Sequence, residues 1–539
     1  MMPRPGYGAR SDAHRGGALS PDSSSHTSGE HLEPLGVRLR KFARQPHVVP
    51  VALISLVFAA LYAVAGLIEH QAFRTALIDL GIYDQATRGY ANFDLPRVPL
   101  FGVRTPTDLG LLHWTDHFTP IQVLLAPFYW VYDGPETLLV AEGVLFALAL
   151  PPIWVFTRRA LGTPAAYLVA CAFELSWPIS SAVWIPFHQV AFATPLIALV
   201  LERFQAGANR QAAVVSLLLL TVREDLGLLI AMLGLLIALR GQKKLGAGLM
   251  LGGTFAVWFI TSVLIPLLGG SPRRNWSYWQ FGRNPFELVV SLISHPLAAL
   301  EYALTPAGKV HTLLWLFGPL LFLPFASRLV LLALPLLVVR FLSDEPNHWI
   351  VGFHYDAFVW PVLVCAAVDA ASRLPSPWRT RLPRLPNAGL AWSVLVAVFA
   401  LAHLPHTPAW RMTARNWWFP YTNVTRAAKH ALAHVPSGAL VAASNSAGVH
   451  LTRRAKVILW VPPGDRRLVE AVWTLRHFHW QYLGDRKLAE ARWVLADTER
   501  HEFPFKSIDE QRASVRSLEK QGYKVVFKEA GYVVLHREP

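Results

Sequence analysis

Long apolar runs separated by short polar loops make up most of the chain as far as about residue 404. A helix needs about 17–25 largely apolar residues to cross the hydrocarbon core of a membrane. A run at 211–244 is too long for one span and is interrupted by the charged residues Arg223–Asp225, which are costly within a bilayer, so we divide it into two spans. The pattern predicts a polytopic α-helical membrane protein with about eleven transmembrane helices. The other predicted spans lie at about 50–68, 137–156, 164–183, 189–202, 245–268, 311–326, 329–342, 357–371 and 388–404.

The charged residues between the runs predict the orientation in the membrane. Arg and Lys gather in alternate loops, and the basic patch VRLRKFAR precedes the first span. Because positively charged loops stay in the cytoplasm, we expect the N-terminus inside and the C-terminus outside the cell membrane. Residues 1–49 are rich in Gly, Ser, Pro and His and lack the core of a signal peptide. They are predicted to form a disordered, basic cytoplasmic tail.

The pattern changes at about residue 406, after the predicted transmembrane domain of residues 50–405. The segments GALVAASN, KVILWV, RWVLAD and YKVVFKEAGYVVLHR predict short strands, and TRAAKHALAHV and IDEQRASVRSLEK predict amphipathic helices. Residues 406–539 are therefore predicted to form a small α/β domain outside the membrane. A long outer loop, residues 69–119, is expected after the first span.

Composition narrows the function classes. The chain of 539 residues is 53% hydrophobic and 16% charged, against about 25% charged in a typical soluble domain. The net charge of +15 is explained by the basic loops, so we expect no nucleic-acid partner. Both cysteines, Cys171 and Cys365, lie in apolar runs, which leaves no disulfide framework or cysteine zinc site. A glycine-rich phosphate loop is also absent from the sequence, so nothing indicates nucleotide binding.

Carboxylates and histidines gather at the predicted outer ends of the spans. Such a concentration on one face is what an outward-facing active site or ligand cavity needs, although each residue alone is also an ordinary polar loop residue. The set comprises Asp79, Asp84, His113, Asp116, His117, His188, Arg223, Glu224, Asp225, Asp344, Glu345, His348, His354 and Asp356.

Two carboxylates follow the first predicted span. Asp84 has Arg88 four residues later, the spacing of an ion pair on one helix face. Asp79 has no such partner, and both catalysis and capping of the next helix are open for it. On a continuous helix the two residues would be separated by about 500°, so they are not expected to work as a carboxylate pair.

Three further segments carry candidate chemistry. In HWTDHF, His113, Asp116 and His117 have helical spacing, and histidines at i and i+4 can share a divalent metal; interfacial hydrogen bonding is the alternative. A divalent metal is the only cofactor that the sequence suggests. His188 in WIPFHQ is either functional or a satisfied interfacial histidine. In REDLG, the cost of charge near hydrocarbon favours a function for at least one residue, with Arg223 or Glu224 facing the cavity.

The order of these motifs resembles a known family. DLGIYDQATR, HWTDHFTPIQVLLAPFYWVYDG, WIPFHQVAFATPLIAL, LTVREDLGL and FHYDAFVWPVL follow one another as in the predicted membrane proteins of domain of unknown function 2079, over about residues 50–539. That family is similar in layout to the GT-C glycosyltransferases. Those multi-span enzymes use polyprenyl-phosphate sugar donors on the outer membrane face and carry an acidic residue in the first outer loop.

The resemblance implies a function and a set of roles. The chain would transfer a sugar from a polyprenyl phosphate to an extracytoplasmic acceptor, with membrane lipid and the lipid-linked sugar as its partners. Asp79 matches the acidic position best and Asp84 is the alternative, although the adjacent acidic pair usual in GT-C enzymes is missing. REDLG falls where many GT-C enzymes carry a basic residue near the donor phosphate, so the predicted phosphate site comprises Arg223, Glu224, His188 and His117.

Two functions of other classes stay open at this point. A transporter or flippase of a lipid-linked solute could use the same charged cavity, although we find no duplicated halves of the kind common in transporters. A non-catalytic membrane scaffold could bind a partner through its outer domain. The sugar, the acceptor and the oligomeric state are not predicted.

Overall fold

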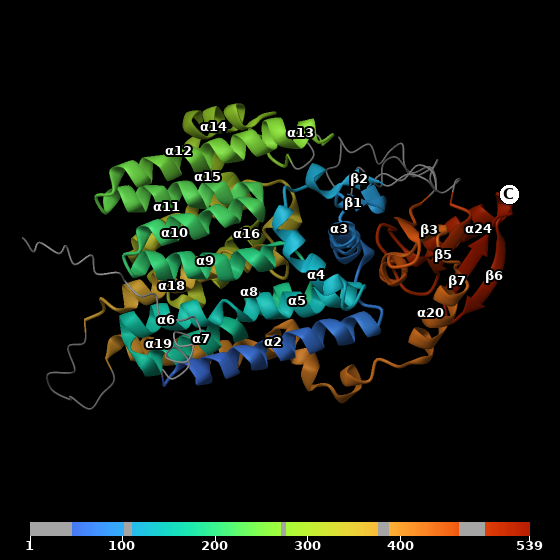
Figure 1. Ribbon diagram of the computed structural model, residues 1–539, viewed down its shortest axis with the longest axis horizontal. Helices are drawn as coiled ribbons and strands as arrows, with labels where there is room; N and C mark the ends of the chain where they lie inside the picture. The colour runs from blue at the N-terminus through green and yellow to red at the C-terminus, as the bar shows by residue number, and fades with distance from the viewer. Residues whose placement is uncertain (1–45, 102–109, 271–275, 376–386, 463–490, 539) are drawn as a thin grey trace, which may run out of the picture. The chain divides into compact units, whose positions relative to one another are not determined.

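The computed structural model describes residues 46–101, 110–270, 276–375, 387–462 and 491–538. The chain divides into two compact units, Met1–Val49 and Pro50–Pro539. Nearly all of the predicted tail, residues 1–49, lies outside the described residues. The second unit contains both the helices and the sheets that Figure 1 shows.

All eleven predicted spans coincide with helical segments. Among the described residues, five stretches are long and apolar enough to cross a membrane: Val48–Gln71, Pro135–Leu161, Thr163–Trp184, Lys243–Leu267 and Ala388–His406. They contain α2 (Val48–Gln71), α5 (Pro135–Ala147), α6 (Leu150–Leu161), α7 (Thr163–Leu175), α8 (Trp177–Trp184), α12 (Lys243–Phe259), α13 (Ile265–Leu267) and α19 (Ala388–His403). Shorter helices occupy the other predicted spans: α9 (Val190–Gln205), α10 (Asn209–Leu217), α11 (Gly227–Leu239), α16 (Ala307–Phe317), α17 (Leu334–Phe341) and α18 (Trp360–Ala371).

One pair of apolar helices has no counterpart among the predicted spans. α14 (Pro285–Ser294) and α15 (Pro296–Leu304) meet at an angle of 104°. Pro296 has no backbone N–H and cannot continue the helix that precedes it. The proline divides the apolar run into two pieces, each too short to indicate a span.

Glycines bring α11 and α12 into close contact. A Cβ atom built on Gly234 would lie 2.6 Å from the backbone oxygen of Gly246, and one on Gly253 would lie 2.5 Å from that of Gly227. Only residues without a side chain permit such an approach, as in other tightly packed membrane helices. The two helices run side by side in Figure 1. Because α11 begins directly after REDLG, this packing also supports the charged segment.

The described residues between α2 and α5 fold into short elements. These include a π-helical turn at Leu77–Gly81, α3 (Ile82–Ala91), the antiparallel pair β1 (Arg97–Val98) and β2 (Leu111–Leu112), 3₁₀ turns at Pro99–Phe101, His113–Thr115 and Pro120–Leu125, and α4 (Ala126–Tyr129).

The C-terminal α/β region, residues 423–536, contains a five-stranded sheet with the order β4-β3-β5-β7-β6. β3, β4 and β5 are parallel, whereas β7 is antiparallel to β5 and β6. The strands lie in the segments that the alternating pattern predicts. The elements are α20 (Asn423–Ala433), β3 (Leu440–Ala443), α21 (Asn445–Gly448), β4 (Lys456–Leu459), β5 (Trp493–Asp497), α24 (Ile508–Lys520), β6 (Lys524–Glu529) and β7 (Tyr532–His536).

Candidate functional site

Asp79 lies in a sharp turn immediately before α3. Its backbone has φ 75° and ψ −86°, close to the γ-turn conformation that residues other than glycine rarely adopt. Such a conformation costs about 1–3 kcal/mol and persists only where the surroundings impose it. The N-cap of α3 is Gly81, without a side-chain cap, so the capping alternative for Asp79 is wrong. Asp79 and Asp84 are also not on one continuous helix, because the chain turns between them.

The carboxylate of Asp79 faces a histidine. Its Oδ1 lies 3.3 Å from Nε2 of His188, and the Asp79 side chain is 37% exposed. On the other side of the ring, Nδ1 of His188 lies 2.7 Å from the carbonyl oxygen of Pro186. Since a carbonyl only accepts, Nδ1 carries a proton. The remaining nitrogen and the carboxylate can then share one proton, which is an arrangement suited to proton transfer.

His188 belongs to a stack of buried rings. The ring of His354 lies 3.6 Å from that of His188. Burial, followed by the charges of His188 and Arg223, holds the pKa of His354 well below its usual range. Burial, then Arg223 and Arg340, lowers the pKa of His348 to about 3. Both rings are therefore neutral at physiological pH, and Arg223 and Arg340 supply permanent positive charge to this cluster.

Arg223 is held in place by its neighbour. Its Nε and Nη2 donate to the Asp225 carboxylate at 2.6 and 2.5 Å, and its guanidinium lies 4.8 Å from the centre of the Phe358 ring. Burial alone would lower the pKa of Arg223, but Asp225 raises it overall. The side chain is buried and stays charged, which is what an anion site beside a membrane requires.

Glu224 connects REDLG to the first outer loop. Its carboxylate lies 2.8 Å from Nδ1 of His117 and accepts from the Phe118 N–H at 3.2 Å. Burial by itself would lower the pKa of His117, but the charge and hydrogen bond of Glu224 raise it overall. The negative charge of Glu224 therefore favours the protonated form of the His117 ring.

Two tyrosines that the sequence reasoning missed lie among these groups. Tyr83 donates to Gln189 and meets His188 edge-on at 5.6 Å. Its pKa is raised by burial and then by Asp79 and Asp116. The Tyr355 ring lies 4.2 Å from that of His354, and burial raises its pKa, with Asp79 adding to the rise and Arg223 opposing it. Aromatic residues near span ends usually form interfacial belts, so the sequence held no specific signal for either.

Arg340 is a second buried cation that the sequence reasoning missed. Its Nη1 donates to Asp356 Oδ1 at 2.6 Å, and its Nε donates to the His348 carbonyl at 2.8 Å. Its Nη2 is buried and has no partner among the described residues. The signal was an arginine inside a predicted span, which is costly without a partner or a function.

The predicted metal ligands do not form one group. His113 lies in a 3₁₀ turn that ends at Thr115, so His113 and His117 do not share a face of an α-helix. His113 meets Tyr83 edge-on at 5.0 Å, whereas His117 pairs with Glu224. Within the described ranges, no three His, Cys, Asp or Glu side chains are gathered to hold a metal ion.

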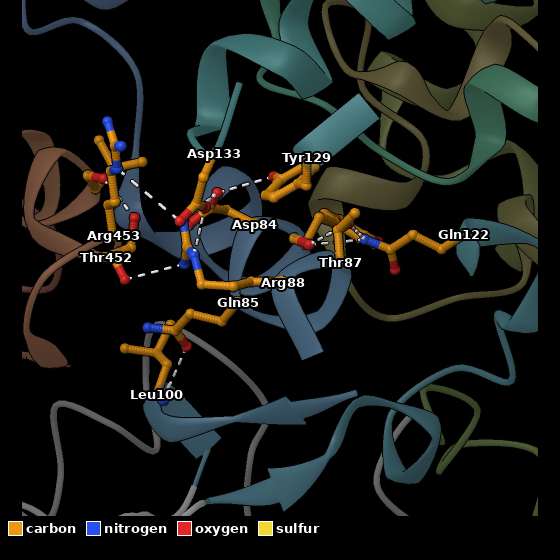
Figure 2. A network of polar contacts seen from close by, with 12 residues as sticks. Asp84, Gln85, Thr87, Arg88, Leu100, Gln122, Tyr129, Asp133, Thr452 and Arg453 are labelled. Atoms are coloured by element: carbon orange, nitrogen blue, oxygen red, sulfur yellow. Dashed lines mark hydrogen bonds and ion pairs between the residues drawn. The ribbon is translucent and has the colours of Figure 1, made fainter. Parts of the chain in front are cut away.

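Asp84 is fully buried and belongs to a separate network, which Figure 2 shows. It accepts from Arg88 Nη1 and Nη2 at 2.9 and 3.0 Å and from the Tyr129 hydroxyl at 2.8 Å. Arg88 also donates to Asp133 at 2.7 Å and to the Thr452 carbonyl at 3.0 Å. The geometry therefore separates an accessible Asp79 from an Asp84 whose oxygens are bound within the protein.

Comparisons with known proteins agree with the motif order. The model of the family described as "Predicted membrane protein (DUF2079)" matches residues 69–534. Comparison with the curated proteins yields no match.

Comparison with solved structures finds membrane proteins of similar fold. ArnT from Cupriavidus metallidurans bound to undecaprenyl phosphate aligns with 14% identity and a TM-score of 0.50, over 91% of this chain and 99% of that chain. The apo state of ArnT aligns over the same shares with 15% identity and a TM-score of 0.50. A further match is archaeal oligosaccharyltransferase AglB from Archaeoglobus fulgidus, in complex with an inhibitory peptide and a dolichol-phosphate. It aligns with 11% identity and a TM-score of 0.45, over 89% of this chain and 74% of that chain. At these identities the likeness to ArnT confirms the predicted layout at the level of the fold.

Proposed function

We propose that this chain, which belongs to the DUF2079 family of predicted membrane proteins, is an integral-membrane glycosyltransferase. It moves a sugar from a polyprenyl-phosphate donor to an acceptor hydroxyl outside the cytoplasm. The observation that carries this proposal is an accessible carboxylate, Asp79, held against His188, whose ring stacks on His354 within the electrostatic influence of the buried cation Arg223. The fold shared with ArnT, whose structure contains undecaprenyl phosphate, supports the donor class.

The residues have separate roles in the proposed reaction. Asp79 takes the proton of the acceptor hydroxyl, whose oxygen then attacks the anomeric carbon of the sugar. The bond from that carbon to the phosphate oxygen breaks, and the electron pair leaves with the polyprenyl phosphate. Arg223 and charged His117 stabilise the departing phosphate. His188 orients Asp79, and Glu224 keeps His117 charged. Asp84 has a structural role.

The proposed topology places this chemistry on the outer face. With about eleven spans and a cytoplasmic N-terminus, the turn at Asp79 and the REDLG segment both lie at outer span ends. The C-terminal α/β region then lies outside the membrane, next to the acceptor.

The test uses the full chain in lipid nanodiscs. A panel of undecaprenyl-phosphate hexoses and pentoses serves as donor, a cell-envelope fraction serves as acceptor, and release of undecaprenyl phosphate is measured by mass spectrometry. We expect Asp79→Asn to reduce release by about 10²–10⁴-fold. Binding of undecaprenyl phosphate itself should stay within about twofold of wild type, because the phosphate ligands are intact.

The matched control is Asp94→Asn, an exposed aspartate of the same outer loop, which should leave release unchanged. Full activity of Asp79→Asn would contradict the assignment of the base. If no donor is turned over but the wild-type chain moves a lipid-linked sugar across proteoliposome membranes, the chain is a flippase and the proposal is wrong.

A further inference from the structure

We propose that Asn445 is a positioning residue for Asp79, so that the C-terminal α/β region completes the active site. The inference rests on the proposed function for its catalytic consequence. Oδ1 of Asn445 accepts a hydrogen bond at 2.9 Å from the backbone N–H of Ile78, the residue immediately before Asp79. The two partners are 367 residues apart in the sequence.

The bond acts on a backbone segment with an unfavourable conformation. Asp79 has a positive φ, whereas Ile78 is extended at φ −62° and ψ 134°. On the far side of the turn, the Ile82 N–H donates to the Asp79 carbonyl. The turn is therefore held from both ends, by the first residue of α3 on one side and by Asn445 on the other. Asn445 therefore supplies the hydrogen bond that fixes the Ile78 amide at the entry to the turn.

Packing around Leu77 also brings α21 next to the Asp79 turn. Leu77 is fully buried, and a Cβ atom on Gly448 would lie 2.8 Å from its Cδ2. A Cβ atom on Gly81 would lie 2.6 Å from Cδ1 of the same leucine. Leu77 thus fits between a glycine of the Asp79 turn and a glycine of α21. The short helix α21 supplies both the hydrogen-bond acceptor and the space for this side chain.

Asn445 is itself held firmly by the sheet. It follows the buried strand β3, and the Ser444 N–H donates to the Leu495 carbonyl of the neighbouring strand at 2.8 Å. The next residue, Ser446, donates its N–H to the Glu502 carboxylate at 2.9 Å and its hydroxyl to the same group. The carboxyl end of a parallel strand is where open α/β sheets usually place their functional side chains.

A second set of contacts joins the same regions. Arg88 of α3 donates to the Thr452 carbonyl at 3.0 Å, and Nε of Arg453 lies 3.9 Å from Asp133 (Figure 2). The C-terminal α/β region therefore contacts the chain on both sides of the beginning of α3. The position of the C-terminal α/β region therefore determines the direction of the Asp79 carboxylate.

The first experiment measures the hydrogen bond without reference to catalysis. In full-length protein in nanodiscs, Asn445→Leu removes the acceptor while keeping the branching of the side chain, whereas Asn445→Asp keeps an oxygen in place. We expect amide exchange at Ile78 to rise by about tenfold or more in the leucine variant and to stay near wild type in the aspartate variant. Asn423→Leu, at an exposed position of α20, is the matched control and should leave exchange unchanged.

The second experiment measures transfer by the same variants. Asn445→Leu should lower kcat by about 10–100-fold while KM for the lipid-linked donor stays within about twofold, because Asp79 is misplaced but the phosphate site is intact. Asn445→Asp should restore most of kcat. A purely structural residue would lower the yield of folded protein without changing kcat per folded molecule.

The outcomes distinguish the two proposals. Unchanged exchange at Ile78 in Asn445→Leu, or an equal rise in Asn445→Asp, would overturn the positioning role. Absence of transfer in the wild-type protein would contradict the proposed function, while the exchange data would still decide the positioning of the turn. If the leucine variant does not fold, Asn445→Ala, which adds no bulk, replaces it in both measurements.

Discussion

The buried pair Asp84–Arg88 gives the sharpest test of which carboxylate is structural. The perturbation is a double-mutant cycle with Asp84→Asn, Arg88→Met and the two combined. Asp84 is completely buried and, without Arg88, would keep the Tyr129 hydroxyl as its only side-chain partner among the described residues. Arg88 is 16% exposed and, without Asp84, would keep Asp133 and the Thr452 carbonyl.

Asp84 and Arg88 keep different numbers of partners when the other is removed, so the two substitutions should lower the free energy of unfolding by different amounts. Removing one partner of a buried ion pair costs about 3–5 kcal/mol, because a charge is left without compensation in a medium of low dielectric. Arg88→Met should reach this range. Asp84→Asn should cost less, about 2 kcal/mol, because the guanidinium keeps two partners and some water. The double variant should be more stable than the sum of the single effects indicates, with a coupling free energy of about 2–3 kcal/mol.

The assay is reversible denaturation in mixed micelles, followed by tryptophan fluorescence, with transfer activity measured on the folded fraction. Activity per folded molecule should stay near wild type in all three variants. A coupling free energy below about 0.5 kcal/mol would refute the inferred buried pair. A loss of activity in stable Asp84→Asn equal to that in Asp79→Asn would refute the structural role of Asp84.

Three further outcomes are expected. Glu224 raises the pKa of His117, so binding of undecaprenyl phosphate should be full below the ordinary histidine pKa and lost as pH rises through the raised pKa of His117. In a binding titration, Glu224→Gln should move the midpoint of this loss to lower pH. Burial raises the pKa of Glu502 from 4.5 to about 7, so its contribution to stability is full below pH 4.5 and lost as pH rises through about 7; Glu502→Gln should flatten the melting temperature over this window. Gly234→Leu should destabilise the protein by about 1–3 kcal/mol through overpacking against the facing helix, whereas Gly248→Leu, where a Cβ atom meets nothing within 4 Å, should be neutral in thermal unfolding.

Much of the fold follows from local pattern. Each predicted span coincides with a helical segment, because a membrane leaves a long apolar segment few alternatives. The short alternating segments likewise predict the strands from β3 to β7. The pair α14 and α15 could not be predicted in the same way, because Pro296 divides one apolar run into two helices that bend sharply. Its course depends on packing rather than on composition.

The sequence predicted which residues form the candidate site, but it did not predict the residues that contact them and hold them in place. Asp79, His188, Arg223 and His117 stand out because charge near hydrocarbon demands a reason, and their catalytic roles remain predictions. Their partners come from distant segments: the Tyr83 hydroxyl and Gln189 are 106 residues apart, and His117 and Glu224 are 107 apart. The left-handed backbone of Asp79 has no local signature, because nothing in its neighbouring residues requires it.

The contact between Ile78 and Asn445 has a consequence for the order of synthesis. Its two partners are separated by 367 residues, which a ribosome adds in about 20–70 s. Throughout that time the first outer loop has been synthesised, whereas Asn445, which accepts its hydrogen bond, has not. On the proposed topology, the C-terminal α/β region must also cross the membrane before it can dock. The carboxylate would therefore acquire its working geometry last, only in chains whose insertion and export are complete.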